Sequence, residues 1–292
     1  MMFASFVVTL RPVKTASIGN STGKSLHGLF FSLLGEENQA LFEQIHSGSE
    51  TRPVTVSPLR GVMQRQDFRR LIMPNQLYSV RYTTLSDELF NALSKILLSK
   101  FIYRGKVDID GVEFVVQDVA VEPDKSRGWG MISSAEEIWE RAAVGREVTL
   151  YFASPTAFKQ KELNLVFPVP KNVFYSYRDK WNKFAPVPID DGFVPWVEEN
   201  VAVEAHDLAT RMVWFSDFQK QGFVGRVRYV ARNHDVARLK QLNALADYAF
   251  FCGTGQKTAQ GMGQTRRMPK REPFKDTDDE SVDTVPQDAA PK

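Results

Sequence analysis

The order of strand-like and helix-like segments is the feature that most limits how this sequence can fold. In the first 125 residues, stretches typical of strands and stretches with helical spacing follow one another roughly as β, α, β, β, α, β. That order is the split βαβ arrangement of a ferredoxin-like or RNA-recognition-type domain, in which two helices cover one face of an antiparallel sheet. We therefore predict such a domain and expect the other face of its sheet to be free.

The segments are located by apolar spacing and by helix-capping residues. Ser86 is expected to cap a helix that carries Leu89, Leu93 and Ile96 on one face. The predicted strands of this first unit are 3–11, 52–58, 76–84, 101–107 and 112–122, and its predicted helices are 25–34, 39–45 and 86–98.

The second half of the chain repeats this kind of pattern. Ser133 or Ser134 is expected to start a helix. The predicted strands are 148–154, 162–170, 202–215 and 223–232, and the later helices are 171–185 and 235–251. We predict an α+β chain of two tandem ferredoxin-like βαββαβ domains, 1–125 and 126–269, with a glycine-rich loop near the end of the second. The polar residues 270–292 are predicted to form a disordered acidic tail, because they offer too little apolar surface to offset the entropy of ordering.

Composition excludes several classes of protein. Apolar residues make up 43% and charged residues 25%, which is ordinary for a globular chain and atypical of a disordered, collagen-like or membrane-embedded one. Residues 3–10 are too short an apolar run for a signal or membrane-spanning segment, so we expect a cytoplasmic protein without a membrane partner. Cys252 is the single cysteine and there are four histidines, so no disulfide and no zinc-finger ligand set is expected, and we predict neither a metal nor a cofactor.

Charge is distributed unevenly along the chain. Residues 273–292 hold two lysines and six acidic side chains, so the rest of the chain carries 35 basic and 29 acidic residues. This excess is compatible with an anionic partner such as nucleic acid, but alone it favours an ordinary soluble surface.

Two glycine-containing runs suggest phosphate binding. Gly19 to Ser25, GNSTGKS, has only three residues between its glycines where a phosphate loop needs four, which argues against a nucleotidase. Gly253, Gly255, Gly261 and Gly263 follow a helix and precede a predicted strand, the reverse of a dinucleotide-binding fingerprint. Such a loop can offer successive backbone N–H groups to phosphates, and a flexible turn is the alternative.

The second run, GTGQKTAQGMGQ, closely resembles the C-terminal glycine-rich signature of the CRISPR-associated repeat-specific endoribonucleases, of the repeat-associated mysterious protein superfamily. The stretch IHSGSETRPVTVSPL, Ile45 to Leu59, is similar to that family's histidine at a helix end, basic loop and strand ending in Ser-Pro-Leu. LHGLFFSLL resembles the helix before it, while residues 60–200 match in pattern only. The resemblance implies two tandem ferredoxin-like domains and metal-independent cleavage of the CRISPR precursor transcript by attack of a ribose 2′-OH, giving a 2′,3′-cyclic phosphate and a 5′-OH.

This resemblance also implies the catalytic residues. His46 matches the family's catalytic histidine and is expected to be the general base or acid; its alternative is a capping or surface role. His27 is the rival, able to face His46 if the two helices pack as a hairpin. Where some relatives have a tyrosine and a lysine, this sequence has Phe31 and Arg52. Arg52 can stabilise negative charge but cannot transfer protons at neutral pH, so the second proton-transfer group is open.

Repeat RNA, including the mature guide RNA, is the expected partner, with other subunits of an interference complex as further possible partners. Arg226, Arg228 and Arg232 lie at strand spacing beside Tyr229 and suit an RNA hairpin, and Arg60 belongs to a basic cluster whose alternative is a solvated helix face. The full set of predicted RNA-binding residues is Lys24, Arg60, Arg226, Arg228, Arg232, Gly253, Gly255, Gln256, Lys257, Gly261, Gly263 and Arg266. The competing function is a non-catalytic RNA-binding subunit of a CRISPR effector complex. His206, His234 and Cys252 are expected to be structural.

Overall fold

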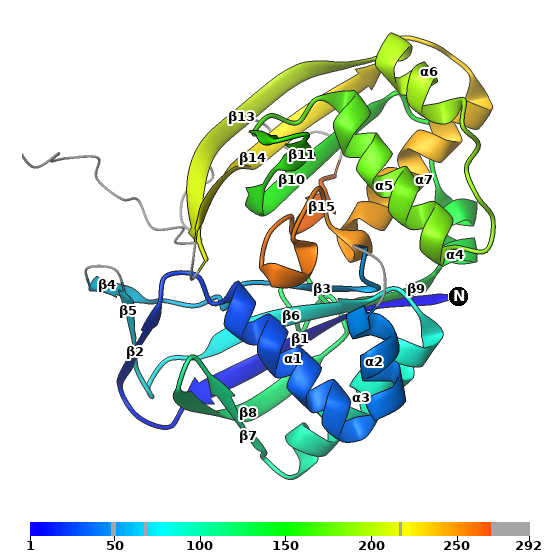
Figure 1. Ribbon diagram of the computed structural model, residues 1–292. Helices are drawn as coiled ribbons and strands as arrows, with labels where there is room; N and C mark the ends of the chain where they lie inside the picture. Colours follow the sequence, from blue (N-terminus) through cyan, green and yellow to red (C-terminus); the bar gives the residue numbers. More distant parts are fainter. Residues whose placement is uncertain (48–50, 67–68, 216–217, 270–292) are drawn as a thin grey trace, which may run out of the picture.

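The computed structural model describes residues 1–47, 51–66, 69–215 and 218–269. These residues form two large antiparallel sheets with packed helices and two small sheets of two and three strands, and the two units lie one above the other in Figure 1. The predicted α+β class with two tandem ferredoxin-like units is confirmed. The predicted acidic tail, 270–292, lies outside the described residues.

The first sheet has the strand order β3-β6-β1-β8-β7, and its first four strands have the ferredoxin-like order. Even-numbered residues of the first strand, such as Phe6 and Val8, are buried with Phe30 and Leu34 from the first helix. Its strands are β1 (Met2–Pro12), β3 (Val54–Val56), β6 (Tyr78–Thr84), β7 (Lys106–Ile109) and β8 (Val112–Ala120), with β9 (Met131–Ser134) pairing β1, and its helices are α1 (Gly23–Glu37), α2 (Gln39–Ser47) and α3 (Asp87–Ile102).

The second sheet has the strand order β13-β14-β10-β15, which is again the ferredoxin-like order. Val227 and Tyr229 are buried against Phe174 and Leu245 from two helices. Its strands are β10 (Glu147–Thr156), β13 (Val201–Trp214), β14 (Gln219–Ala231) and β15 (Thr265–Arg267), with helices α4 (Ala135–Arg141), α5 (Pro170–Phe184), α6 (Phe193–Asn200) and α7 (Val236–Cys252).

Capping residues set several helix starts as predicted. The Ser134 hydroxyl accepts a hydrogen bond from the backbone N–H of Glu137, whose carboxylate accepts one from the N–H of Ser134. Ser86 accepts from the N–H of Leu89 at 3.3 Å, and Asp235 caps α7. These local interactions explain why the helix starts could be read from sequence.

Two local predictions are wrong, and so is the helical alternative for the Arg60 cluster. Residues 101–102 continue α3, and the strand predicted at 101–107 is β7, four residues long. Residues around the Arg60 cluster are not helical: β4 (Gln64–Gln66) and β5 (Arg69–Ile72) pair, and β5 also pairs β2 (Ala16–Gly19). The strand predicted at 162–170 is limited to β12 (Leu163–Leu165), which pairs β11 (Phe158–Gln160), because Pro168 and Pro170 lead into α5.

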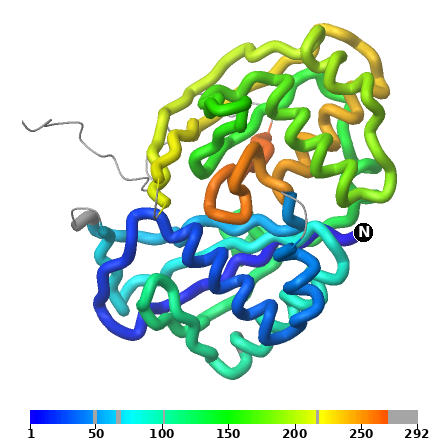
Figure 2. Tube along the Cα trace, in the orientation of Figure 1, coloured from blue at the N-terminus to red at the C-terminus, as the bar shows by residue number. Residues whose placement is uncertain are grey.

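The second face of the first sheet is covered, contrary to the prediction that it is free. Arg81 on β6 is 3% exposed and donates to the carbonyl of Phe250 and to the side-chain oxygen of Gln264. Thr83, two residues on, donates to the carbonyl of Phe251. The end of α7 therefore packs on the sheet face where an isolated RNA-recognition domain would be open, and the glycine segment that follows lies between the units, as the orange trace in Figure 2 shows.

Candidate active site

Phe31 on α1 is the centre of the group of side chains that the sequence predicts to be catalytic. The rings of His27 and Phe31, one helical turn apart, have centroids 4.7 Å apart, and those of Phe31 and His46 are 6.0 Å apart. The guanidinium of Arg52 lies over the Phe31 ring, 4.8 Å from its centroid. The structure therefore brings together His27, His46 and Arg52. Helices α1 and α2 pack against each other, which was the condition for the two histidines to lie close together.

His27 is hydrogen-bonded to Arg52. The distance from Arg52 Nη1 to His27 Nε2 is 3.0 Å, and because guanidinium only donates, Nε2 accepts. The ring is therefore neutral, with its proton on Nδ1, which is buried and makes no hydrogen bond of good geometry within the described residues. Burial, followed by the charge of Arg52, lowers the pKa of His27 from 6.5 to about 4; His46 and Lys257 act in the same direction and the Ala259 carbonyl in the opposite one.

Replacing Arg52 by glutamine should raise the pKa of His27 from about 4 toward its ordinary value of 6.5 without reaching it. The variant removes a positive charge that disfavours the protonated ring, while burial, the larger cause, remains. An NMR titration of the His27 ring in both proteins measures the shift. Arg228→Gln, which removes a guanidinium paired with Glu204, is the matched control. An unchanged His27 pKa in the Arg52 variant would contradict the conclusion that the charge of Arg52 lowers that pKa.

The other side of this group is the glycine segment, residues 253–264, between α7 and β15. A short 3-10 helix, η1 (Thr258–Gln260), lies against α1 and β3. The N–H of Gly261 donates to the carbonyl of Val56 at 3.0 Å, and a Cβ at Gly23 would lie 2.3 Å from the carbonyl oxygen of Gln260. This close approach of backbones holds the segment against the start of the helix that carries His27.

The glycine amides that the sequence predicts to face phosphates donate to acceptors within the protein in this conformation. The N–H of Gly253 donates to Ala249, that of Gly255 to the Ser176 hydroxyl, that of Gly261 to Val56 and that of Gly263 to Pro155. Glycine is needed at two of these positions because φ is positive and space is absent: a Cβ would lie 2.3 Å from the Ala157 oxygen at Gly255 and 2.1 Å from the Thr254 oxygen at Gly263. Within the segment, Gln256 and Lys257 carry long polar side chains that can contact groups outside it.

The predicted RNA-binding side chains fall into three groups. Lys24, one turn before His27 on α1, and Lys257 belong to the histidine group, whereas Gln256 accepts from Lys220 and donates to Asn164 in the second unit. Arg60 and Arg266 lie over the ring of Trp129, at 4.6 and 5.1 Å from its centroid. Arg226 and Arg228 point away from the core on β14, and Arg232 is exposed just beyond its end.

One predicted aromatic contact is wrong and another was missed. Tyr229 is fully buried and donates to the Pro168 carbonyl, so it cannot stack on RNA beside the arginines of β14. Trp129 instead joins Arg60 and Arg266, and also lies 5.2 Å from the Arg81 guanidinium. The Gly-Trp-Gly context of Trp129 predicts only a turn, since the three arginines come from distant parts of the chain.

The remaining residues singled out from the sequence lie elsewhere. His206 contacts Phe167 and His234 contacts Arg146, both in the second unit. Cys252 is fully buried, and burial raises the pKa of its thiol to about 12. Within the described ranges there is no group of three or more His, Cys, Asp or Glu side chains that could hold a metal ion, and no helix long and apolar enough to cross a membrane.

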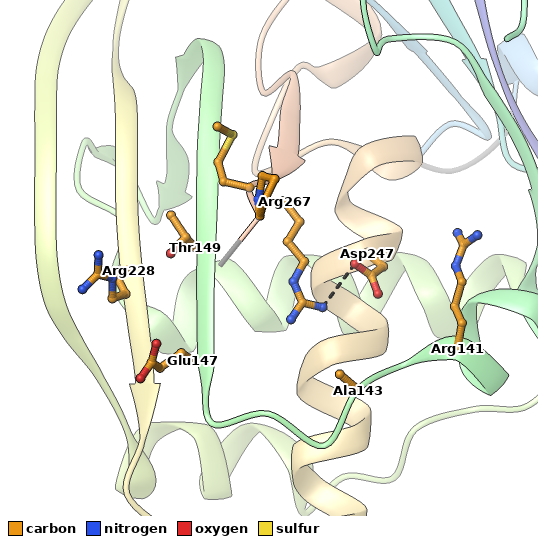
Figure 3. Close-up of a pocket in the computed structure, with 9 residues that line it drawn as sticks. Arg141, Ala143, Glu147, Thr149, Arg228, Asp247 and Arg267 are labelled. Atoms are coloured by element: carbon orange, nitrogen blue, oxygen red, sulfur yellow. Dashed lines mark hydrogen bonds and ion pairs between the residues drawn. The ribbon is translucent and has the colours of Figure 1, made fainter. Parts of the chain in front are cut away.

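A polar pocket of about 420 Å³ lies in the second unit (Figure 3). Arg267 points across it toward Asp247, with 3.2 Å between Nη1 and Oδ1. Arg141 and Arg228 also line it, together with Glu147. Its lining contains no histidine and mixes acidic with basic groups, so the candidate active site is the Phe31-centred group rather than this pocket.

Both halves of the chain match models of the same protein family. The family model described as CRISPR Cas6 N-terminal domain matches residues 2–140, and the one described as CRISPR-associated endoribonuclease Cas6 matches residues 150–265. A CRISPR-associated endoribonuclease Cas6 from Mycobacterium tuberculosis is 28% identical over 125 residues, which is 42% of this chain and 40% of that protein. The matched region thus spans about two fifths of the length of that curated relative.

Solved structures show the same fold over nearly the whole chain. A Cas6 product complex is 24% identical, with a TM-score of 0.75, covering 92% of this chain and 100% of that one. Thermus thermophilus Cas6 is also 24% identical, with a TM-score of 0.70 and coverage of 91% and 98%. A Cas6-related protein from Pyrococcus furiosus is 11% identical, with a TM-score of 0.64 and coverage of 92% and 100%.

Proposed function

Because this chain belongs to the family of CRISPR-associated Cas6 endoribonucleases, we propose that it binds CRISPR repeat RNA and cleaves the precursor transcript at the Phe31-centred group. The observation that carries this proposal is that His27, His46 and Arg52 all contact the ring of Phe31. His46 and Arg52 come 19 and 25 residues after His27 in the sequence. Several relatives are described as product or substrate-mimic complexes, which supports an RNA ligand for this chain.

Attack by the ribose 2′-OH on the neighbouring phosphorus requires a base for the 2′-proton. His46 suits that task because it is exposed and because the described contacts of its ring are with Phe31 and Phe42 rather than with a cation. His27 is less suited, since its Nε2 already accepts from Arg52 and its Nδ1 is buried. We assign His46 as the general base and His27 as the residue that orients Arg52.

The phosphorane formed in this attack carries more negative charge than the ground state, and cationic groups stabilise it. Arg52 has a fixed fork of donors and keeps its charge at neutral pH. One of its N–H groups is used by His27, and its guanidinium lies over Phe31, which leaves other donors for phosphate oxygens. These groups supply the base and the electrostatic stabilisation for a cleavage that gives a 2′,3′-cyclic phosphate and a 5′-OH without a metal ion.

Binding of the repeat would draw on the three groups of basic side chains described above. Lys24 is on the helix that carries His27. Arg60 and Arg266 on Trp129, Arg226 and Arg228 on β14, and Arg232 just beyond its end lie along the second unit and its contact with the first. Contacts of arginine and lysine with phosphates and 2′-hydroxyls suit A-form RNA, so we propose a short repeat hairpin as the substrate. Retention of the guide RNA and association with other effector subunits are extensions of the same proposal.

The first test compares two repeat RNAs in EDTA, one all-ribose and one with a single 2′-deoxy sugar upstream of the cut. We expect cleavage of the all-ribose RNA and none of the 2′-deoxy RNA, because the second lacks the nucleophile. The products are identified by their 2′,3′-cyclic phosphate and 5′-OH ends. Tight binding of both RNAs without cleavage of either would overturn the proposal and favour a non-catalytic RNA-binding subunit.

A further inference from the structure

The glycine segment contributes a proton-transfer group that the histidine region lacks. Resting on the proposed function, we propose that Lys257 is the general acid that protonates the 5′-oxygen leaving group. Phe31 has no exchangeable proton, and Arg52 does not release one at neutral pH. His27 is held as an acceptor by Arg52, so it has no proton on Nε2 to give.

The backbone at Lys257 is in an unusual conformation for a residue with a side chain. Its φ is +55° and its ψ is +32°, the left-handed region, although glycines are close by on both sides. Residues other than glycine persist in this region only when the surrounding structure holds them there, and such residues cluster at functional sites. Here the carbonyl of Lys257 accepts from the N–H groups of Gln260 and Met262, which close the turn around η1.

The side chain of Lys257 is held by identifiable contacts. Its ammonium donates to the side-chain oxygen of Gln260 at 3.1 Å. It also lies over two aromatic rings near the tip of the β13–β14 hairpin, 5.0 Å from the centroid of Phe215 and 5.2 Å from that of Phe218. Those rings are stacked on each other at 4.8 Å. A cation held by a ring pair and one amide keeps further N–H donors for a ligand.

The turn that carries Lys257 packs against the start of α1, the helix that carries His27, and several basic side chains surround it. The charge of Lys257 is among those that disfavour protonation of His27, and Gln260 and Gly261 of the same turn pack on Gly23 of α1. Burial, followed by the charges of Lys220 and Lys24, lowers the pKa of the Lys257 ammonium. A lysine with a lowered pKa is a better proton donor than an exposed one.

The proposed step is balanced as follows. The 2′-oxygen forms a bond to phosphorus and gives its proton to the base, while the bond from phosphorus to the 5′-oxygen breaks. The electron pair of that bond stays on the 5′-oxygen, which takes a proton from the ammonium of Lys257. Neutral Lys257 then regains a proton from water, and no oxidant, reductant or metal is consumed.

The test measures single-turnover cleavage of two repeat RNAs that differ only in the leaving atom, 5′-oxygen or bridging 5′-sulfur. A thiolate leaves without protonation, so only the oxygen substrate depends on a general acid. For Lys257→Met we expect a loss of about 10²-fold with oxygen and less than about threefold with sulfur. Lys257→Arg keeps the charge but not a transferable proton, so it should show the same pattern.

Lys220→Met is the matched control. Lys220 lies 5.9 Å from the Phe218 ring and donates to Gln256, so the variant removes a neighbouring charge from the same surface. Any loss in this variant should be equal for the two substrates. Binding of the uncleavable 2′-deoxy repeat reports on folding: every variant should retain it, with a similar small loss in Lys257→Met and Lys220→Met because each removes one positive charge.

The outcomes separate this proposal from the proposed function. Two results would show that Lys257 acts through its charge and not as a proton donor, and would overturn the proposal. One is an equal loss of cleavage rate for the oxygen and sulfur substrates in Lys257→Met, and the other is full activity of Lys257→Arg on the oxygen substrate. Undiminished cleavage by Lys257→Met would also overturn it. If the wild-type protein cleaves neither RNA, the proposed function itself fails.

Discussion

Replacing His46 by alanine is expected to lower the single-turnover rate of repeat cleavage by roughly 10²–10⁴, as for loss of a general base. The imidazole is exposed at the end of α2, where ring contacts with Phe31 and Phe42 hold it beside the groups that would face the phosphate. Since the side chain makes no buried hydrogen bond within the described residues, its truncation should leave the fold and the dissociation constant for a 2′-deoxy repeat nearly unchanged.

Two histidine variants serve as comparisons for this prediction. His206→Ala removes a histidine from β13 that contacts Phe167, and it should cleave at the wild-type rate. His27→Ala should slow cleavage less than His46→Ala, because it disturbs the orientation of Arg52 without removing the base. A wild-type rate in His46→Ala together with a large loss in His27→Ala would reverse the assignment of the base.

Replacing Arg81 by methionine is expected to lower the free energy of unfolding by about 1–3 kcal/mol, the range for leaving buried hydrogen-bond acceptors without their donor. Arg81 donates to the Ser5 hydroxyl, the carbonyls of Trp129 and Phe250 and the side chain of Gln264. Methionine fills part of the volume but leaves these acceptors without their donor in a site closed to water.

The size of this effect follows from where Arg81 lies. Its partners come from β1, from the turn before β9, from the last turn of α7 and from the glycine segment, so one side chain connects both units. Carbonyl oxygens at the C-terminal end of α7 carry partial negative charge and compensate the cation. Burial nevertheless lowers the pKa of Arg81 well below its ordinary value, which reflects the cost of keeping the charge inside.

Urea unfolding followed by circular dichroism measures the change. Arg11→Met is the matched control, because Arg11 is exposed and donates only to the Pro74 carbonyl among the described residues; its free energy of unfolding should change by less than about 0.5 kcal/mol. A loss below about 1 kcal/mol in Arg81→Met would mean that the two units do not depend on this residue.

Much of the fold could be predicted because it is encoded over short distances. Apolar spacing in α3 reflects which face of that helix is buried, and Ser86, Ser134 and Asp235 mark helix starts by capping bonds within three residues. The predicted ends of helices and strands were wrong where local propensity and tertiary packing favour different structures. Residues 101–102 read as a strand but extend α3, and α6 was not predicted because its eight residues carry no capping side chain.

The candidate site was predictable only as a set of residue types. His46, Arg52 and the glycine run carried the family resemblance, and His27 was recognised as a rival by its place on the first helix. The sequence could not show that Arg52 would donate to His27 rather than His46, because that choice depends on how α1, α2 and the start of β3 pack. It also assigned the four glycines to phosphate binding, whereas the structure uses their amides to close the segment.

The sequence by itself therefore determined the order of elements, the α+β class and the residues from which a site could be built, because periodicity and capping act between near neighbours. Only the tertiary structure decided that α7 covers the second face of the first sheet and that the turn carrying Lys257 packs against the start of α1. Both depend on contacts between segments more than 160 residues apart, such as those from Arg81 to Phe250 and from Thr83 to Phe251, which are separated by 169 and 168 residues. No local pattern specifies such pairs, since they form only when the two units pack and bury a shared surface.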